Sequence, residues 1–237
     1  MDGLFITFEG NEGSGKSTQI KILAERLQAA GKSPLVLREP GGTPIGEEIR
    51  HTLQHSATNG AMMPETELLL MNASRAQLIR ESIRPALARG QIVLCDRFID
   101  STIAYQAYGR ELHRQTVQQV IEIAIGETQP DLTLMLKVPV SVSEQRRSAR
   151  NQSSPKTRDR MEEAGRAFFE RVDLGYEELS AANPTRIRVV DATVSIESVA
   201  GEIWKWVGPL IDEPDLEGEK TYKSLGEWKT ARLDEPR

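Results

Sequence analysis

The chain has 237 residues, of which 38% are hydrophobic and 27% are charged, with a single cysteine and a formal net charge of −5 at pH 7. This composition supports the core of one globular domain. The absence of a long basic block excludes the charge pattern of a polynucleotide-binding protein, so any nucleotide partner is expected to be a small molecule. No secretory leader or apolar stretch of roughly 18 residues is recognisable, and one cysteine cannot form an internal disulfide, so we expect a cytoplasmic protein without a membrane segment.

Short apolar runs rich in β-forming residues alternate with longer segments of helical period. This alternation is typical of an α/β protein, in which helices cover both faces of a parallel sheet. Five strands are predicted, at residues 4–9, 34–38, 91–95, 132–138 and 186–190. Helices are predicted at 16–30, 44–54, 64–89, 115–126, 140–150, 160–181 and 196–207, and Pro85 could kink the long one.

Two stretches lack either pattern. Residues 151–157 read NQSSPKT, which is polar and rich in turn-forming residues, so we expect a mobile connection between two helices. Residues 209–237 are charged and interrupted by proline and glycine, which is typical of an appended tail. Such a tail is either disordered or anchored to the domain by Tyr222, Leu225 and Trp228.

A phosphate-binding loop follows the first predicted strand. Residues 10–17 read GNEGSGKS, which fits the pattern G-x-x-x-x-G-K-[ST] between a strand and a helix. The glycines let backbone amides turn toward phosphate oxygens, Lys16 adds a charge near the β- and γ-phosphates, and Ser17 offers a hydroxyl to Mg²⁺. A glycine-rich turn that binds nothing is the disfavoured alternative. The candidate ATP-binding residues are Gly10, Asn11, Glu12, Gly13, Ser14, Gly15, Lys16, Ser17 and Thr18.

Polar residues also follow the second and third strands. Asp96 and Arg97 end the third strand, and the sequence REPGGT at 38–43 follows the second. Ligands of open α/β sheets bind at this carboxyl edge, where Asp96 is suited to the magnesium shell and Arg97 to a phosphate. A surface ion pair between the two neighbours is the alternative. The loop alone predicts nucleotide binding and does not establish catalysis.

The motifs, in their order along the chain, resemble those of the bacterial thymidylate kinases. The matching stretches are FEGNEGSGKST (8–18), REPGGT (38–43), SRAQL (74–78), RPALARG (84–90), DRFIDSTIAYQ (96–106), PDLTLMLKV (130–138) and RDRMEEAGRAFF (158–169). The resemblance implies a three-layer P-loop kinase fold at 1–208, with a small mobile lid at about 146–162 followed by the tail at 209–237. It also implies a homodimeric enzyme that uses ATP and Mg²⁺ to convert dTMP to dTDP in dTTP biosynthesis.

Roles for individual residues follow from the same resemblance. Glu12 would approach the acceptor sugar or its phosphate, Arg97 would hold the acceptor phosphate, and Arg75 would address the thymine edge. Ser101 and Gln106 would contact the base, and Tyr105 would occupy the space of a ribose 2′-hydroxyl. Without the resemblance, Arg75 would be read as a solvated helix residue and Tyr105 as packing. The candidate substrate-binding residues are Arg38, Glu39, Pro40, Met71, Arg75, Arg97, Ser101, Tyr105 and Gln106.

Three features depart from the family pattern. Met71 stands where the family usually has a phenylalanine against the base, Lys137 stands where relatives often have an aspartate, and the lid carries extra residues. The thioether of Met71 contacts aromatic faces but orients a ring less firmly, which leaves open a kinase for another nucleoside monophosphate or for a deoxynucleoside. A non-catalytic nucleotide sensor is a second alternative, and it would not require the basic residues that follow the second and third strands.

Phosphoryl transfer depends on positioning and charge neutralisation, and members of the family that the chain resembles carry the charge-stabilising arginine either in the phosphate-binding loop or in the lid. This loop contains no arginine, so the resemblance implies that the lid supplies it. Arg150 and Arg158 lie nearest the polar connection and are the favoured residues, and a solvated helix face is the alternative. The candidate lid arginines are Arg146, Arg147, Arg150, Arg158 and Arg160, and the candidate catalytic residues are Lys16, Glu12, Arg97, Arg150 and Arg158.

Overall fold

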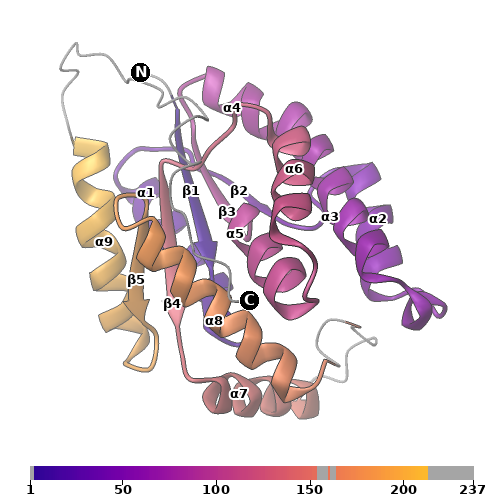
Figure 1. Ribbon diagram of the computed structural model, residues 1–237. Helices are drawn as coiled ribbons and strands as arrows, with labels where there is room; N and C mark the ends of the chain where they lie inside the picture. The colour runs from indigo at the N-terminus through magenta and orange to yellow at the C-terminus, as the bar shows by residue number, and fades with distance from the viewer. Residues whose placement is uncertain (1–2, 154–159, 161–163, 213–237) are drawn as a thin grey trace.

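The computed structural model describes residues 3–153, 160 and 164–212, with only the backbone described at 150–153 and 212. Its centre is a parallel sheet in the order β2-β3-β1-β4-β5, which confirms the predicted five strands (Figure 1). The strands are β1 (Leu4–Glu9), β2 (Leu35–Arg38), β3 (Ile92–Asp96), β4 (Leu132–Lys137) and β5 (Ile187–Asp191). Asp96 is in register with both Phe8 and Arg38, so the three loops that carry the predicted motifs leave the sheet side by side.

Helices cover both faces of the sheet, because successive strand residues point to opposite sides. Ile6 packs in one core with α1 (Lys16–Ala29) and α9 (Ile196–Asp212), whereas Phe5 packs in a second core with α3 (Pro64–Leu78) and α6 (Arg114–Ile125). A third cluster joins β4 and β5 to α8 (Arg166–Ala182), which crosses the front of the sheet in Figure 1. The three-layer arrangement is thus confirmed.

Two further helices pack on others, one against α3 and one against α8. The helix α2 (Pro44–Gln54) begins at Thr43, whose hydroxyl accepts a hydrogen bond from the Gly46 amide at 3.0 Å, and it packs against α3. Its bounds match the prediction, since Pro44 and Glu47 supply the usual signals of a helix start. The helix α7 (Val140–Ser153) continues three residues past the predicted end at 150, so the predicted connection begins as helix. Residues 154–157 of that connection lie outside the described residues.

The predicted helix at 64–89 is divided into three parts. After α3 the chain forms a π-helical segment, Ile79–Ile83, and then α4 (Arg84–Ala88). Pro85 has no amide proton to donate to the carbonyl four residues earlier, and a wider turn just before it accommodates that loss. The sequence prediction was therefore wrong about continuity and right about the position of the irregularity.

Other boundaries differ from the predictions as well. The helix α5 (Ile99–Thr102) and the π-helical segment Ile103–Gly109 were not predicted, because five of their eleven residues are β-branched or aromatic and favour strands. Gly165 has an extended backbone, so α8 begins at Arg166 instead of at 160. The helix α9 passes through Pro209 to Asp212, beyond the predicted end at 207, and the tail from 213 onward lies outside the described residues. No helix in the described part of the chain is long and apolar enough to span a membrane.

Candidate active site

The phosphate-binding loop joins β1 to α1 through glycines in left-handed conformations. Gly10 has a φ of 129° and Gly15 a φ of 96°. A Cβ atom on Gly10 would lie 2.3 Å from the carbonyl oxygen of Leu136, so glycine is required there for packing as well as for its backbone angle. The loop ends at the N-terminus of α1, where free backbone amides and the helix dipole favour a bound phosphate. Ser14 is buried within this loop, and Thr18 is exposed on the first turn of the helix.

Lys16 spans the mouth of this loop. Its ammonium donates to the carbonyl oxygens of Gly10 at 3.0 Å and Asn11 at 3.1 Å, and its side chain is buried. Burial and the nearby Arg97 lower the pKa of Lys16 below its ordinary value, while Glu12 raises it. Nearby carboxylates compensate the positive charge of this buried ammonium only in part. The phosphates of a nucleotide held by the loop would complete that compensation.

Ser17 and Asp96, the two residues predicted to bind magnesium, lie within hydrogen-bond distance of each other. The Ser17 hydroxyl donates to the Asp96 carboxylate at 3.0 Å, although the two residues come from α1 and from the end of β3. Proteins usually bind Mg²⁺ through one or two such oxygens together with substrate phosphates, so the pair fits the metal. Among the described residues no cluster of three acidic, histidine or cysteine side chains offers another metal site.

Arg97 connects the loop to the opposite side of the edge. Its backbone is left-handed, with a φ of 70°, and its amide donates to the carbonyl oxygen of Phe8 at 2.9 Å. One end of its guanidinium, Nη1, donates to the hydroxyls of Ser101 at 2.9 Å and Tyr176 at 3.1 Å. The other end, Nη2, contacts the Glu12 carboxylate at 2.5 Å and the Tyr105 hydroxyl at 3.1 Å. Asp96 instead binds Ser17, so the structure does not support a simple ion pair between neighbouring residues.

The second glycine-rich loop, 39–43, faces the same edge. The peptide bond between Glu39 and Pro40 is cis, and the Gly41 amide donates to the Ser74 hydroxyl at 3.0 Å, which fixes the loop on α3. Arg38 forms a two-point ion pair with Glu47, at 2.8 and 3.0 Å, and about half of each side chain is exposed. A phosphate that binds Arg38 would therefore replace a partner that is already hydrated.

Arg75 is a buried link between α3 and the two loops. Its side chain is 3% exposed and forms an ion pair with Glu39 at 2.6 Å. It also donates to the side chains of Asn72 and Thr102 and to the carbonyl oxygen of Phe98 at 2.9 Å. The alternative of a solvated helix residue is therefore wrong. The contact of Arg75 with a thymine edge remains a prediction. In such a contact the base would replace one of these protein partners.

The remaining residues predicted to bind the acceptor nucleotide lie in two different surroundings, one aromatic and one beside a buried carboxylate. Met71 packs against the cluster that contains Tyr105, and burial raises the pKa of Tyr105 to about 12, so its phenol stays neutral. Gln106 instead donates to the buried carboxylate of Glu67 at 2.8 Å. Burial by itself would raise the pKa of Glu67, but hydrogen bonds from Arg110, Gln106 and Arg160 lower it below its ordinary value.

Comparisons with known proteins agree with this geometry. The sequence profile of the family described as thymidylate kinase matches residues 8–203. The chain is 49% identical over 203 residues to a thymidylate kinase of Thermomicrobium roseum, covering 86% of this chain and 93% of the relative. The thymidylate kinase of Pseudomonas syringae pv. tomato is 46% identical, covering 90% of this chain and 98% of the relative. The chain belongs to the thymidylate kinase family.

A solved structure supports the same assignment. The crystal structure of a thymidylate kinase from Ehrlichia chaffeensis superposes with a TM-score of 0.69 at 33% identity, covering 88% of this chain and 99% of that one. The fold is thus that of a P-loop kinase.

Three of the five lid arginines have defined positions in this family member. Arg146 donates to the carbonyl oxygens of Gly13 at 3.3 Å and Ala192 at 3.1 Å, Arg147 lies 4.0 Å from the centre of the Phe169 ring, and Arg160 contacts Glu67 and the carbonyl oxygen of Met62. The side chains of Arg147 and Arg160 are largely buried, so a solvated helix face does not describe these two. Arg158 and the side chain of Arg150 lie outside the described residues.

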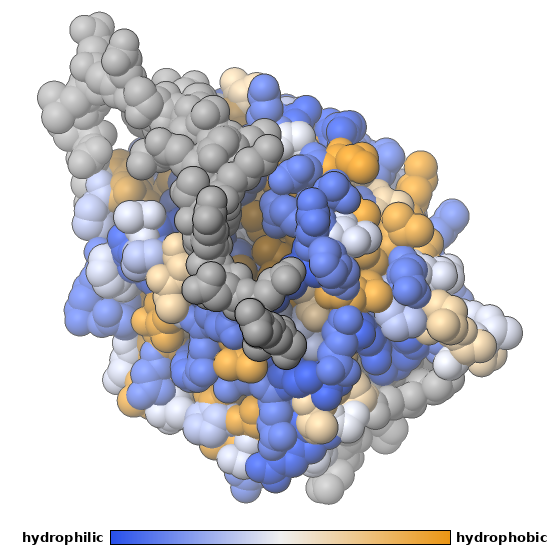
Figure 2. All heavy atoms as spheres, viewed as in Figure 1, coloured by the Kyte–Doolittle hydropathy of each residue, from blue (hydrophilic) through white to orange (hydrophobic). Residues whose placement is uncertain are grey.

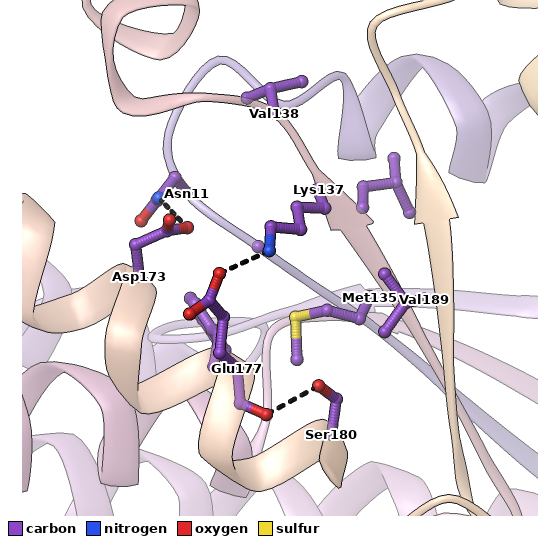
Figure 3. Close-up of a pocket in the computed structure, with 11 residues that line it drawn as sticks. Asn11, Met135, Lys137, Val138, Asp173, Glu177, Ser180 and Val189 are labelled. Atoms are coloured by element: carbon purple, nitrogen blue, oxygen red, sulfur yellow. Dashed lines mark hydrogen bonds and ion pairs between the residues drawn. The ribbon is translucent and has the colours of Figure 1, made fainter.

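Lys137 lines a pocket between α8 and the ends of β4 and β5. The pocket has a cavity volume of about 100 Å³, and Lys137 donates to Glu177 at its rim at 2.5 Å (Figure 3). Asp173 lies one helical turn away and accepts a hydrogen bond from Asn11 of the phosphate-binding loop at 3.1 Å. Burial raises the pKa of Asp173, and the Lys137 charge lowers it. Two carboxylates of α8 therefore lie near the positive charge of Lys137.

Sequence reasoning missed Glu9 and Tyr176, which both contact the Arg97 cluster. Glu9 accepts hydrogen bonds from the Phe98 amide and from the Ser101 and Tyr176 hydroxyls. A carboxylate at the end of the otherwise apolar strand LFITF was the available signal for Glu9. Tyr176 had no such signal, since it is one aromatic residue of an amphipathic helix.

Replacement of Arg97 by alanine tests its position on the acceptor side. Each hydrogen bond to a charged group contributes about 1.5–3 kcal/mol, so we expect Arg97→Ala to raise the KM for dTMP by at least about tenfold. Both residues have side chains at Cβ, so the backbone strain at a φ of 70° is the same in the two proteins. Steady-state kinetics with each nucleotide varied in turn measures the effect. An equal rise in the KM for ATP would place Arg97 on the donor side.

Proposed function

We propose that this protein is an ATP-dependent nucleoside monophosphate kinase that converts dTMP to dTDP, a step of dTTP biosynthesis. The observation that carries the proposal is the contact between Glu12 of the phosphate-binding loop and Arg97 after β3, at 2.5 Å. This contact brings the proposed ATP-binding loop and Arg97, a second cation suited to a phosphate, to one edge of the sheet. A nucleotide sensor would need the loop alone.

The two halves of the site can hold two nucleotides end to end. Lys16 and the loop amides would bind the β- and γ-phosphates of ATP, and Arg97 would bind the phosphate of dTMP across Glu12. Ser17 and Asp96 would hold Mg²⁺, which supplies charge neutralisation on the phosphates when it is bound. The chain itself then contributes alignment and positive charge, which account for most of the catalysis of phosphoryl transfer.

The acceptor nucleoside would lie between α3 and the segment that contains Tyr105. The buried Tyr105 phenol stays close to Arg97, with the ring centre 4.9 Å from the guanidinium carbon, and would exclude a 2′-hydroxyl from that space. Met71 packs in the same cluster and would contact the base. A second candidate function, a kinase for another nucleoside monophosphate or a deoxynucleoside, is motivated by this methionine.

We further propose that the enzyme is a cytoplasmic homodimer. Leu69 of α3 is 58% exposed and Ile123 of α6 is 78% exposed, and these two helices pack against each other. Figure 2 shows hydrophobic residues among the hydrophilic ones on the side of the molecule that these helices occupy. Exposed apolar residues on paired helices favour self-association. Cys95 is a buried free thiol, as expected in a reducing compartment.

A coupled assay of ADP release across nucleoside monophosphates tests the proposed function. The panel contains the thymidine, uridine, cytidine and guanosine monophosphates and their deoxy or ribo counterparts. One methyl group in an apolar pocket changes kcat/KM by about 10- to 200-fold, so we expect dTMP to exceed dUMP by at least about tenfold. A higher kcat/KM for any other acceptor would favour the second candidate function.

Replacement of Met71 by phenylalanine tests the position of the base. An aromatic pair contributes about 1 kcal/mol beyond buried area, so Met71→Phe is expected to tighten dTMP binding several-fold. Isothermal titration calorimetry measures the change. Unchanged or weaker binding would show that the base does not lie against residue 71.

Removal of the lid arginines tests their part in the transition state. An arginine supplied to the transferring group contributes about 10³ to 10⁵ in rate, so Arg150→Ala or Arg158→Ala is expected to reduce kcat strongly and to leave the KM for dTMP nearly unchanged. Arg166→Ala is the matched control, because Arg166 is an exposed arginine paired with Glu170 at 2.9 Å. If both single variants and the double variant keep kcat within about threefold of wild type, Lys16, Arg97 and Mg²⁺ supply the charge alone.

A further inference from the structure

Glu9 is a fully buried carboxylate at the end of β1, immediately before the phosphate-binding loop. One oxygen, Oε1, accepts hydrogen bonds from the backbone amides of Phe98 at 2.8 Å and Ser101 at 3.2 Å. The other, Oε2, accepts from the Ser101 hydroxyl at 2.5 Å and the Tyr176 hydroxyl at 3.1 Å. The carboxylate therefore fixes the turn after Arg97 and the Tyr176 side chain of α8 relative to each other.

The same two hydroxyls accept hydrogen bonds from Arg97. Its Nη1 lies 2.9 Å from the Ser101 oxygen and 3.1 Å from the Tyr176 oxygen. A hydroxyl has one proton and two lone pairs, so a hydroxyl that donates to Glu9 presents a lone pair to the guanidinium. The two hydroxyl oxygens are also 3.0 Å apart, so one hydroxyl can donate its proton to the other, and Glu9 is the acceptor for the proton that remains.

We propose that Glu9 is a positioning residue for the acceptor phosphate, acting through the Ser101 and Tyr176 hydroxyls to anchor one end of Arg97. The inference rests on the proposed function, in which Arg97 binds that phosphate. The anchored end is Nη1, and the opposite end faces Glu12 and Tyr105. A phosphate can therefore exchange with Glu12 while Arg97 keeps its orientation, which is the pre-organisation that tight binding of a bidentate anion requires.

The ionised state of Glu9 is set by its surroundings. Burial and the nearby Asp100 raise its pKa to about 7, whereas Arg97 and the hydrogen bonds from Ser101 and Phe98 lower it. Asp100 is itself paired with Arg186 at 2.7 Å. The charged or titratable groups that interact with Glu9 are Lys16, Cys95, Arg97, Asp100, Tyr105, Tyr176 and Arg186. A protonated Glu9 would donate a hydrogen bond and reverse one of the two hydroxyls.

The variant Glu9→Gln tests the proposal, since it keeps the shape of the side chain and removes the charge. We expect the KM for dTMP to rise by about tenfold or more, the scale of one hydrogen bond to a charged group, and the KM for ATP to stay within about twofold. Tyr176→Phe is expected to give a smaller rise of the same kind. Tyr108→Phe is the matched control, because the Tyr108 hydroxyl binds Glu178 away from Arg97, and it should leave both constants unchanged.

The double variant Glu9→Gln/Tyr176→Phe separates positioning from a general loss of structure. If Glu9 acts through the hydroxyls, the double variant should raise the KM for dTMP by less than the product of the two single effects. Effects that multiply fully, or an equal rise in the KM for ATP, would overturn the proposal. Failure of the proposed function would appear differently, as the absence of dTMP phosphorylation by the wild-type protein.

The pH dependence supplies a readout that a purely structural role would not move. As pH falls through about 7, protonation of Glu9 should lower kcat/KM for dTMP in the wild type. This fall should be absent in Glu9→Gln. Only the fall near pH 6 that comes from the second ionisation of the substrate's phosphate monoester should remain. The folded pKa lies above the ordinary value, so ionisation of Glu9 destabilises the fold as pH rises. Wild type should therefore lose thermal stability relative to Glu9→Gln as pH rises from 4.5 to about 7, with little further change above that. The same kinetic limb and the same stability profile in both proteins would overturn the proposal.

Discussion

The guanidinium of Arg97 is the cation on which the arrangement of this site depends. Its side chain is 13% exposed, and its partners come from the phosphate-binding loop, the turn after β3 and the helix α8. A charge so far removed from water persists only where several acceptors satisfy it. Glu12 and the three hydroxyls of Ser101, Tyr105 and Tyr176 do so, and in the same contacts they fix the distance between the two phosphate-binding regions.

This arrangement has a cost in stability. The left-handed backbone of Arg97 is unfavourable by on the order of 1 kcal/mol for a residue with a Cβ atom, and the ionised form of the buried Glu9 destabilises the fold at neutral pH. Such features persist where a site must be held ready for its ligand. A second contact, the hydrogen bond from Asn11 to Asp173, connects the phosphate-binding loop to α8.

Local patterns in the sequence predicted the sheet, the phosphate-binding loop and α2. Buried parallel strands appear as apolar runs, and Thr43, Pro44 and Glu47 are local signals of a helix start. The burial of Arg75 was not predictable, because arginine is ordinarily solvated and its partner Glu39 is 36 residues away. The contact between Glu9 and Tyr176 spans 167 residues and follows only from the packing of α8 on the sheet. The roles of Arg150 and Arg158 remain predictions.

The most direct test of the account follows the phosphoryl group itself. ATP labelled at the γ-phosphate is incubated with dTMP and Mg²⁺, and the labelled products are separated and identified for the wild type and for Lys16→Ala. We expect the label to appear in dTDP with the wild type and to be reduced at least about 10²-fold with the variant, because a charge aimed at the transferring group is lost. Circular dichroism confirms that the variant is folded. Label released only as inorganic phosphate, or transfer by Lys16→Ala at the wild-type rate, would contradict the account.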